Sequence, residues 1–220
     1  MSRQDQGPRA AGAWPARPTI RRWLFAAGTV LAGGALLGSA PAGAGDPAGD
    51  ILMFDNRFAP AVAVVAQGQS VEFTNFGQVG HDAQDGTGID LFTSGLIEPP
   101  ETVTIGPLPG AGVYRYYCTF HPEMVGRIRV PVRVSRTQSP AGSGVTVRWA
   151  AGRAPSGLVY DVQRRRPGTD GFVDWRVGVT AGSARFRPSV RGLWTIRARV
   201  RQQAGEGSSD WSPARAIRVT

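Results

Sequence analysis

Several residue types are scarce or absent in this chain of 220 residues, and each scarcity excludes a class of protein. There is no lysine, so all 25 basic residues are arginines, and there is one cysteine with only two histidines. A single cysteine excludes an internal disulfide framework, and two histidines are too few for a multinuclear oxygen-reducing cluster. Charged residues make up only 19%, while 30 glycines and 17 prolines interrupt the sequence. This composition excludes a coiled coil and favours turn-rich β structure.

The net charge of +9 is distributed unevenly. Residues 45–131 carry four Arg against ten acids, a net −6, whereas residues 132–220 carry sixteen Arg against five acids, a net +11. A basic half can attract nucleic acid, an anionic polymer or an anionic membrane. No recognition motif accompanies these arginines, so no nucleic-acid partner is expected. A cell-wall component or a protein is the expected partner of residues 132–220.

Residues 1–44 are typical of an export signal. Arg21-Arg22 precedes an apolar stretch over residues 23–40 that four glycines interrupt, a pattern similar to a twin-arginine signal, and Ala42-Gly43-Ala44 offers a cleavage site. An uncleaved membrane anchor and general secretory export are the alternatives. We expect an extracytoplasmic protein, secreted, periplasmic or envelope-associated, with no stable membrane span after cleavage.

The mature chain reads as two all-β domains, residues 45–131 and residues 132–220, each a β-sandwich of short strands. Apolar runs alternate with turn residues, and no window of helical periodicity is long enough to predict a helix. Residues 81–101 form the longest connection. The first domain is predicted to have strands at 51–54, 61–65, 70–75, 102–105, 113–118 and 127–130, and the second at 132–134, 145–150, 158–164, 172–177, 184–187, 194–201 and 216–219.

Metal-binding side chains cluster within seven residues. Cys118, His121 and Met124 bring a thiolate, an imidazole and a thioether together, and His81 lies upstream. Two histidines, one cysteine and a weak methionine are the donors of blue copper sites, and alternation along 113–118 points Cys118 inward. Zinc is the competing metal, although methionine is a poor zinc ligand. Taken singly, each residue also fits an ordinary core or strand-end role.

Residues 51–130 resemble a cupredoxin of the plastocyanin, pseudoazurin and amicyanin kind. The resemblance rests on Phe-Ala-Pro at 58–60, Gly-Gln-Ser-Val-Glu-Phe-Thr-Asn at 68–75, Gly-His at 80–81, and the segments 112–118 and 124–130. It implies one type 1 copper ion, with His81, Cys118 and His121 as equatorial ligands and Met124 as the axial ligand. The Gly80 carbonyl would be a distant contact.

The sequence departs from this family after the first histidine. Asp82 stands where the family usually has Asn, whose backbone approaches the cysteine sulfur and whose side chain ties down the ligand loop. Asp82 is expected to keep the backbone contact, and Thr119 is expected to accept or donate a hydrogen bond within the loop. The added negative charge is expected to favour Cu(II) and lower the potential.

The resemblance also implies a route for electrons. His121 lies between Phe120 and Pro122, so the edge of its ring is expected to emerge through an apolar patch where a redox protein docks. Tyr117 matches the position of a second route in some members of the family. A structural role for Tyr117, as an ordinary strand residue, is the alternative.

Residues 132–220 resemble a fibronectin type III module, an immunoglobulin-like β-sandwich. The resemblance rests on Val-Thr-Val-Arg-Trp at 145–149, Tyr-Asp-Val-Gln at 160–163, the strand 192–200, and Asp-Trp-Ser-Pro at 210–213. Trp194 stands where the family usually has the tyrosine of a corner hydrogen bond.

The expected function is one-electron transfer by an exported blue copper protein, with the type III module positioning it or binding a partner. Copper buffering or delivery is the alternative, and an adhesion protein with a structural copper site is a third. An enzyme is not expected, because copper oxidases and nitrite reductases of this superfamily need further histidines for a second copper centre.

Overall fold

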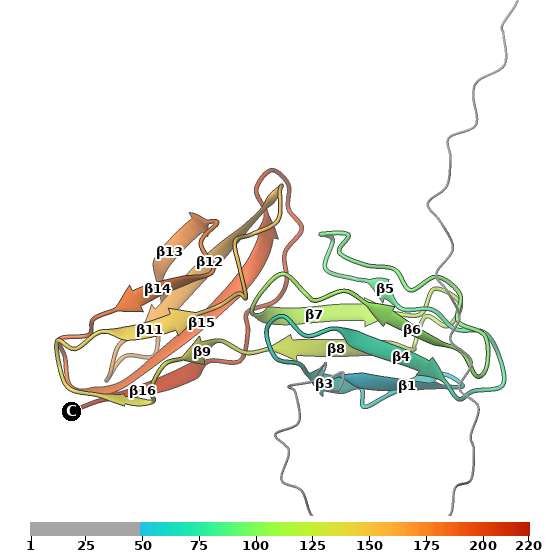
Figure 1. The fold of residues 1–220 in the computed structure, drawn as a ribbon, viewed down its shortest axis with the longest axis horizontal. Coiled ribbons are helices and arrows are strands. Elements are labelled where there is room, and N and C mark those ends of the chain that lie inside the picture. The colour runs from blue at the N-terminus through green and yellow to red at the C-terminus, as the bar shows by residue number, and fades with distance from the viewer. Residues whose placement is uncertain (1–48) are drawn as a thin grey trace, which may run out of the picture. The chain divides into compact units, whose positions relative to one another are not determined.

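Residues 49–220, the part of the chain that the structure describes, fold into short β-strands (Figure 1). The structure is a computed structural model, and no helix lies among these residues. Gly, Pro, Asn and Asp interrupt each apolar run, so no run is long enough to form a helix of several turns. The predicted all-β class is confirmed. The predicted export segment, residues 1–44, lies outside the described range, and within that range nothing helical is long and apolar enough to cross a membrane.

The first sandwich consists of two four-stranded sheets, ordered β2-β1-β4-β6 and β3-β8-β7-β5. The pairs β1/β4 and β3/β8 are parallel, and the other neighbours are antiparallel. Parallel neighbours need crossover connections, so the chain changes sheets several times. The strands are β1 (Asp50–Phe54), β2 (Arg57–Ala59), β3 (Val62–Val64), β4 (Val71–Asn75), β5 (Gln84–Asp85), β6 (Thr102–Ile105), β7 (Gly112–Tyr117) and β8 (Val125–Val130).

The second sandwich has a five-stranded sheet, β10-β16-β15-β12-β13, and a three-stranded sheet, β14-β11-β9. Its longest strand, β15, alternates buried Ile196, Ala198 and Val200 with more exposed arginines, because successive side chains of a strand point to opposite faces. The strands are β9 (Arg133–Val134), β10 (Gln138–Ser139), β11 (Val145–Arg148), β12 (Leu158–Arg165), β13 (Val173–Val179), β14 (Ser183–Phe186), β15 (Gly192–Gln202) and β16 (Arg215–Val219).

A tryptophan makes the corner bond of the second sandwich. The indole Nε1–H of Trp194 donates to the carbonyl of Val190 at 2.9 Å, a few residues upstream. The corner tyrosine of related sandwiches makes the same kind of bond back to the backbone. Trp194 therefore supplies both the corner hydrogen bond and a large buried ring, which packs edge-on against Phe186.

The strand predictions miss three strands and misplace several strand ends. The pattern does not predict β2, β5 or β10, and it extends β7 to Cys118, whereas the strand ends at Tyr117. Residues 81–101, predicted as one connection, contain β5 and two isolated bridges, His81 to Ile97 and Gln84 to Thr93. The three missed strands have only two or three residues each, too few to show a clear alternation, so their hydrogen bonds identify them.

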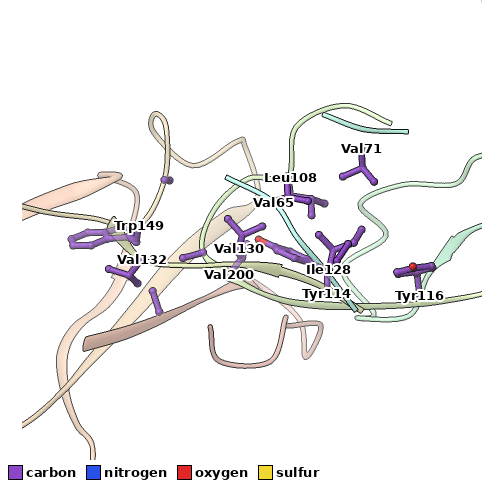
Figure 2. Close-up of a cluster of buried hydrophobic side chains, with 14 of the residues drawn as sticks. Val65, Val71, Leu108, Tyr114, Tyr116, Ile128, Val130, Val132, Trp149 and Val200 are labelled. Atoms are coloured by element: carbon purple, nitrogen blue, oxygen red, sulfur yellow. The ribbon is translucent and has the colours of Figure 1, made fainter. Parts of the chain in front are cut away.

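A continuous set of buried side chains joins the two sandwiches, and the described residues 49–220 belong to one compact unit. Figure 2 shows Trp149, Val132 and Val200, from the second sandwich, in one buried cluster with Val130 and Tyr114 from the first. At the start of β7, the Ala111 N–H donates to the Trp149 carbonyl at 2.6 Å. The second sandwich thus contacts the first at the beginning of β7. The other end of β7 lies about 20 Å from this contact, since each strand residue adds about 3.3 Å.

Candidate metal centre

Three side chains that are far apart in the sequence converge beyond the end of β7. Nδ1 of His81 lies 3.1 Å from Nδ1 of His121, and Sγ of Cys118 lies 3.8 Å and 3.5 Å from these two nitrogens. All three donor atoms lie within 4.8 Å of one another. Two imidazole nitrogens and one sulfur at this spacing can share one metal ion, so the donors fit a mononuclear site.

Backbone hydrogen bonds hold each donor in place. His81 exchanges two with Ile97, at 3.2 Å and 2.7 Å. The Cys118 N–H donates to the Met124 carbonyl at 3.0 Å, and the Met124 N–H donates to the His121 carbonyl at 2.9 Å. The loop from Cys118 to Met124 is therefore a closed turn that carries two of the three donors.

The site is buried on the side of His81 and Cys118. Both side chains are inaccessible to solvent, which confirms the predicted inward orientation of Cys118, whereas His121 is half-buried. Burial, with His121 nearby, lowers the pKa of His81 below its ordinary value, so its imidazole is neutral at pH 7 and can offer a lone pair. Burial also raises the pKa of the Cys118 thiol, so metal binding must release its proton.

The Asp82 carboxylate cross-links the two segments that carry the donors. Its two oxygens accept hydrogen bonds from the backbone N–H and the hydroxyl of Thr119, each at 2.6 Å. These bonds join the residue after His81 to the residue after Cys118. Asp82 is itself buried whereas Thr119 is exposed, and the cross-link limits how far the donors can move apart.

Met124 and Gly80 lie where the ligand segments begin or end. The Met124 side chain is fully buried, in the same closed turn as Cys118. A Cβ at Gly80 would lie 2.7 Å from Cδ1 of Leu96, so the exposed Leu96 side chain packs closely over Gly80, beside His81. The axial role of Met124 and the contact of the Gly80 carbonyl stay predictions.

The surface around His121 is apolar. Phe120 is 57% exposed, and Leu96, which packs over Gly80, is 52% exposed. Pro122 is also exposed. Tyr117 is 39% exposed on the outer face of β7, as alternation predicts. Exposed apolar groups beside a half-buried ligand histidine form a surface that excludes water when another protein docks.

Asp55 is a functional candidate that sequence reasoning misses. It lies in the turn between β1 and β2, where its Oδ1 is 3.7 Å from Nε2 of His81 and accepts a hydrogen bond from the Gln78 N–H at 2.7 Å. Nε2 of His81 is buried and has no hydrogen-bond partner among the described residues. A carboxylate beside the outer nitrogen favours the tautomer that leaves Nδ1 free for a metal. Aspartate is an ordinary turn residue, so the sequence carries no signal of this role.

Replacing Asp55 by alanine is expected to weaken metal binding by about tenfold or more, because His81 loses the group that orients it. Copper affinity, measured by competition with a chelator of known affinity, checks this. Asp55→Asn is the matched control, since an amide oxygen can still accept from the Gln78 N–H and from His81, and its loss should be smaller. Equal affinity in the alanine variant and the unmodified protein would contradict the assignment.

The fold and the donor set define an all-β protein with a mononuclear site of two imidazoles and one thiolate. No family model matches the chain, and no curated protein does. Among solved structures, the chain is similar to a purple cupredoxin from Nitrosopumilus maritimus, with 26% identity and a TM-score of 0.34 over 37% of this chain and 98% of that one.

Two other solved structures match a comparable share of the chain. A Cu(I) form of an amicyanin variant shows 22% identity and a TM-score of 0.36 over 40% of this chain and 87% of that one. A copper-containing nitrite reductase from Thermus scotoductus shows 31% identity and a TM-score of 0.32 over 37% of this chain and 22% of that one. These scores are below 0.5, so the geometry of the site carries the functional argument.

Proposed function

We propose that the protein binds one type 1 copper ion and carries single electrons. The convergence of the two Nδ1 atoms and the cysteine sulfur, each within 4.8 Å of the others, carries this proposal. His81, Cys118 and His121 would hold the ion as equatorial ligands, with Met124 as the axial ligand. Thiolate and thioether donors favour Cu(I), and imidazoles serve both oxidation states, so bound copper would supply reversible one-electron chemistry.

The residues around the donors favour fast electron exchange because they restrict movement. The Asp82 to Thr119 bonds and the closed turn from Cys118 to Met124 hold the donors through the protein's own hydrogen bonds. A donor set held in this way would rearrange little when one electron arrives. The same bonds argue against ready release of the metal, which a copper buffering or delivery protein would need.

The exposed edge of the site offers a place for a redox protein to dock. His121 is half-buried among exposed Phe120, Pro122 and Leu96, and the second sandwich contacts the opposite end of β7. The docking surface is thus free for a partner. Tyr117, exposed beside the cysteine, would offer a second route. The net −6 of residues 45–131 would steer a basic partner toward this half.

The second sandwich would act as a fibronectin type III-like module that positions the copper domain outside the cytoplasm. The three-stranded and five-stranded sheets and the Trp194 corner bond support this assignment. We infer a carrier and not an enzyme, because both histidines of the chain belong to one site and none is left for a second copper centre. Export would follow from the signal-like residues 1–44.

Adding one equivalent of Cu(II) to the purified protein tests the proposal. The expected result is an intense visible absorption band and narrow copper hyperfine splitting in electron paramagnetic resonance, both from the thiolate of Cys118. A mild reductant should bleach the band reversibly. Cys118→Ala is the control and should lack the band. Because Cys118 is fully buried, this substitution leaves the surface of the protein unchanged.

Other results would redirect the assignment. Tight Cu(I) binding with no reversible bleaching would favour buffering or delivery. Preferred zinc binding, measured in the same competition assay, would favour a structural metal site. A band that persists in Cys118→Ala would exclude the thiolate as the ligand.

A further inference from the structure

Arginines line the outer face of the five-stranded sheet in the second sandwich. Alternation along β15 places Arg197, Arg199 and Arg201 on the face opposite to the buried Ile196, Ala198 and Val200. Strand β12 pairs with β15 so that Gln163 lies opposite Arg197 and Asp161 opposite Arg199. Arg165, two residues beyond Gln163, therefore joins the same face.

Aromatic rings hold these guanidinium groups in fixed positions. The guanidinium carbon of Arg197 lies 3.9 Å from the ring centre of Phe172 and 4.8 Å from that of Trp211. Arg199 lies 4.7 Å from Trp211, and Arg165 lies 5.2 Å from Phe172. Because stacking already restricts these side chains, the arginines lose less conformational freedom when they bind a ligand.

Positive charge on this face exceeds negative charge, because the four arginines lie there with two acids, the buried Asp161 and the exposed Asp174, which accepts a hydrogen bond from Gln163. Asp161 alone serves both Arg199 and Arg201, at 3.1 Å and 2.9 Å. Arg197 donates to the amide oxygen of Gln163, and Arg165 donates to the Thr195 hydroxyl, both neutral acceptors. Burial and the neighbouring Arg165 and Arg199 lower the pKa of Arg197 below its ordinary value, as expected where like charges crowd together.

We propose that the face formed by Arg165, Arg197, Arg199 and Arg201, with Phe172 and Trp211, binds a linear acidic polysaccharide through the carboxylates of its sugar units. The face already holds one carboxylate, that of Asp161, between two guanidinium groups. Alternate residues of a strand are about 7 Å apart, so the guanidinium groups form a row that suits a polymer with regularly repeated charges. This site is independent of the copper proposal.

Single-stranded nucleic acid fits the face less well. Binding of single strands depends on aromatic rings that stack on bases, and here guanidinium groups lie over Phe172 and Trp211. A sheet face also presents no helix or two-stranded ribbon that could enter the major groove of a duplex. Repulsion from the acidic residues 45–131, with their net −6, would direct an anionic polymer to the second sandwich.

Binding of the intact protein to polygalacturonate, measured by calorimetry at 50 mM and 200 mM salt, tests the proposal. Saturable binding is expected that weakens with salt and is absent for fully methyl-esterified polygalacturonate. The double variant Arg165→Gln/Arg197→Gln should bind at least tenfold more weakly, with a salt slope lower by about one for each arginine removed. Melting temperature and copper spectrum should confirm that the variant is folded.

The matched control removes two charges from the other sheet. Arg133 and Arg185, on β9 and β14, are exposed, and Arg133→Gln/Arg185→Gln should leave the affinity within twofold of the unmodified protein. Equal losses in both double variants would show attraction by net charge alone and would overturn the site. Absence of binding at 50 mM salt would overturn it too, as would tighter binding to dextran sulfate, an oligothymidylate or vesicles with 30% phosphatidylglycerol.

Discussion

Replacing Asp161 by alanine is expected to lower the free energy of unfolding by about 3 kcal/mol. The Asp161 side chain is only 5% exposed, and it accepts hydrogen bonds from Arg199, Arg201 and the Gly178 N–H. Alanine would leave the two guanidinium groups without their shared acid and the N–H without an acceptor. Both arginines are about one-third exposed and can regain water, which places the expected loss at the lower end for a buried ion pair. Urea unfolding measures it.

The effect of pH separates the charge of Asp161 from its packing. Burial raises the pKa of this carboxyl, but the bonds from Gly178, Arg201 and Arg199 outweigh burial and lower the pKa below its ordinary value. A lowered pKa contributes stability that is present above about pH 4, the ordinary carboxyl range, and is lost as the pH falls. The stability difference between the unmodified protein and Asp161→Asn should therefore stay constant from pH 7 to about 5 and shrink below 4.

A surface acid provides the control for this prediction. Asp174 is exposed and accepts one bond from Gln163, so Asp174→Ala should change stability by no more than about 0.5 kcal/mol. A loss for Asp161→Ala as small as that for Asp174→Ala would mean that the two arginines are equally well solvated without their partner. That result would contradict the stabilising role of the buried pair.

The sequence predicts what depends on residue identity and strand period. Cys118 could be placed inward because Tyr114, Tyr116 and Cys118 alternate with Arg115 and Tyr117, and the structure buries the first three. The grouping of His81 with Cys118 and His121 could be predicted because the chain has only one cysteine and two histidines. Such predictions need only local pattern and composition.

Features that depend on contacts between residues far apart in the chain cannot be predicted from the sequence. Asp55 reaches His81 only because β1 and β4 are paired in parallel, which brings the β1–β2 turn beside the segment that follows β4. The strands β2, β5 and β10 exist because longer neighbours pair with them, and their own residues show no period. The stacking of Arg197 on Phe172 and Trp211 likewise joins three separate segments.

Replacing Gly126 by alanine is expected to destabilise the protein by about 2 to 3 kcal/mol through overpacking. Gly126 pairs with Tyr116 across β7 and β8, and an added Cβ would overlap the tyrosine ring. The ring cannot move aside easily, because it is buried and packs edge-on against Phe58 and Phe73. Thermal and urea unfolding measure the loss, with Gly106→Ala as the control, since a Cβ at Gly106 meets nothing within 4 Å.

A double-mutant cycle shows whether the Tyr116 ring causes this loss. In a Tyr116→Leu background the obstructing ring atoms are gone, so Gly126→Ala should cost at least 1 kcal/mol less than in the unmodified protein. Tyr116→Phe alone should be neutral or slightly stabilising, because the Tyr116 hydroxyl is buried without a hydrogen-bond partner among the described residues. Additive effects in the cycle would show that the glycine serves the backbone of β8 instead. Tyr116 and Cys118 are both buried and lie two residues apart, so a displaced ring should also alter the absorption band of copper bound as proposed, and a loss of stability alone would not shift that band.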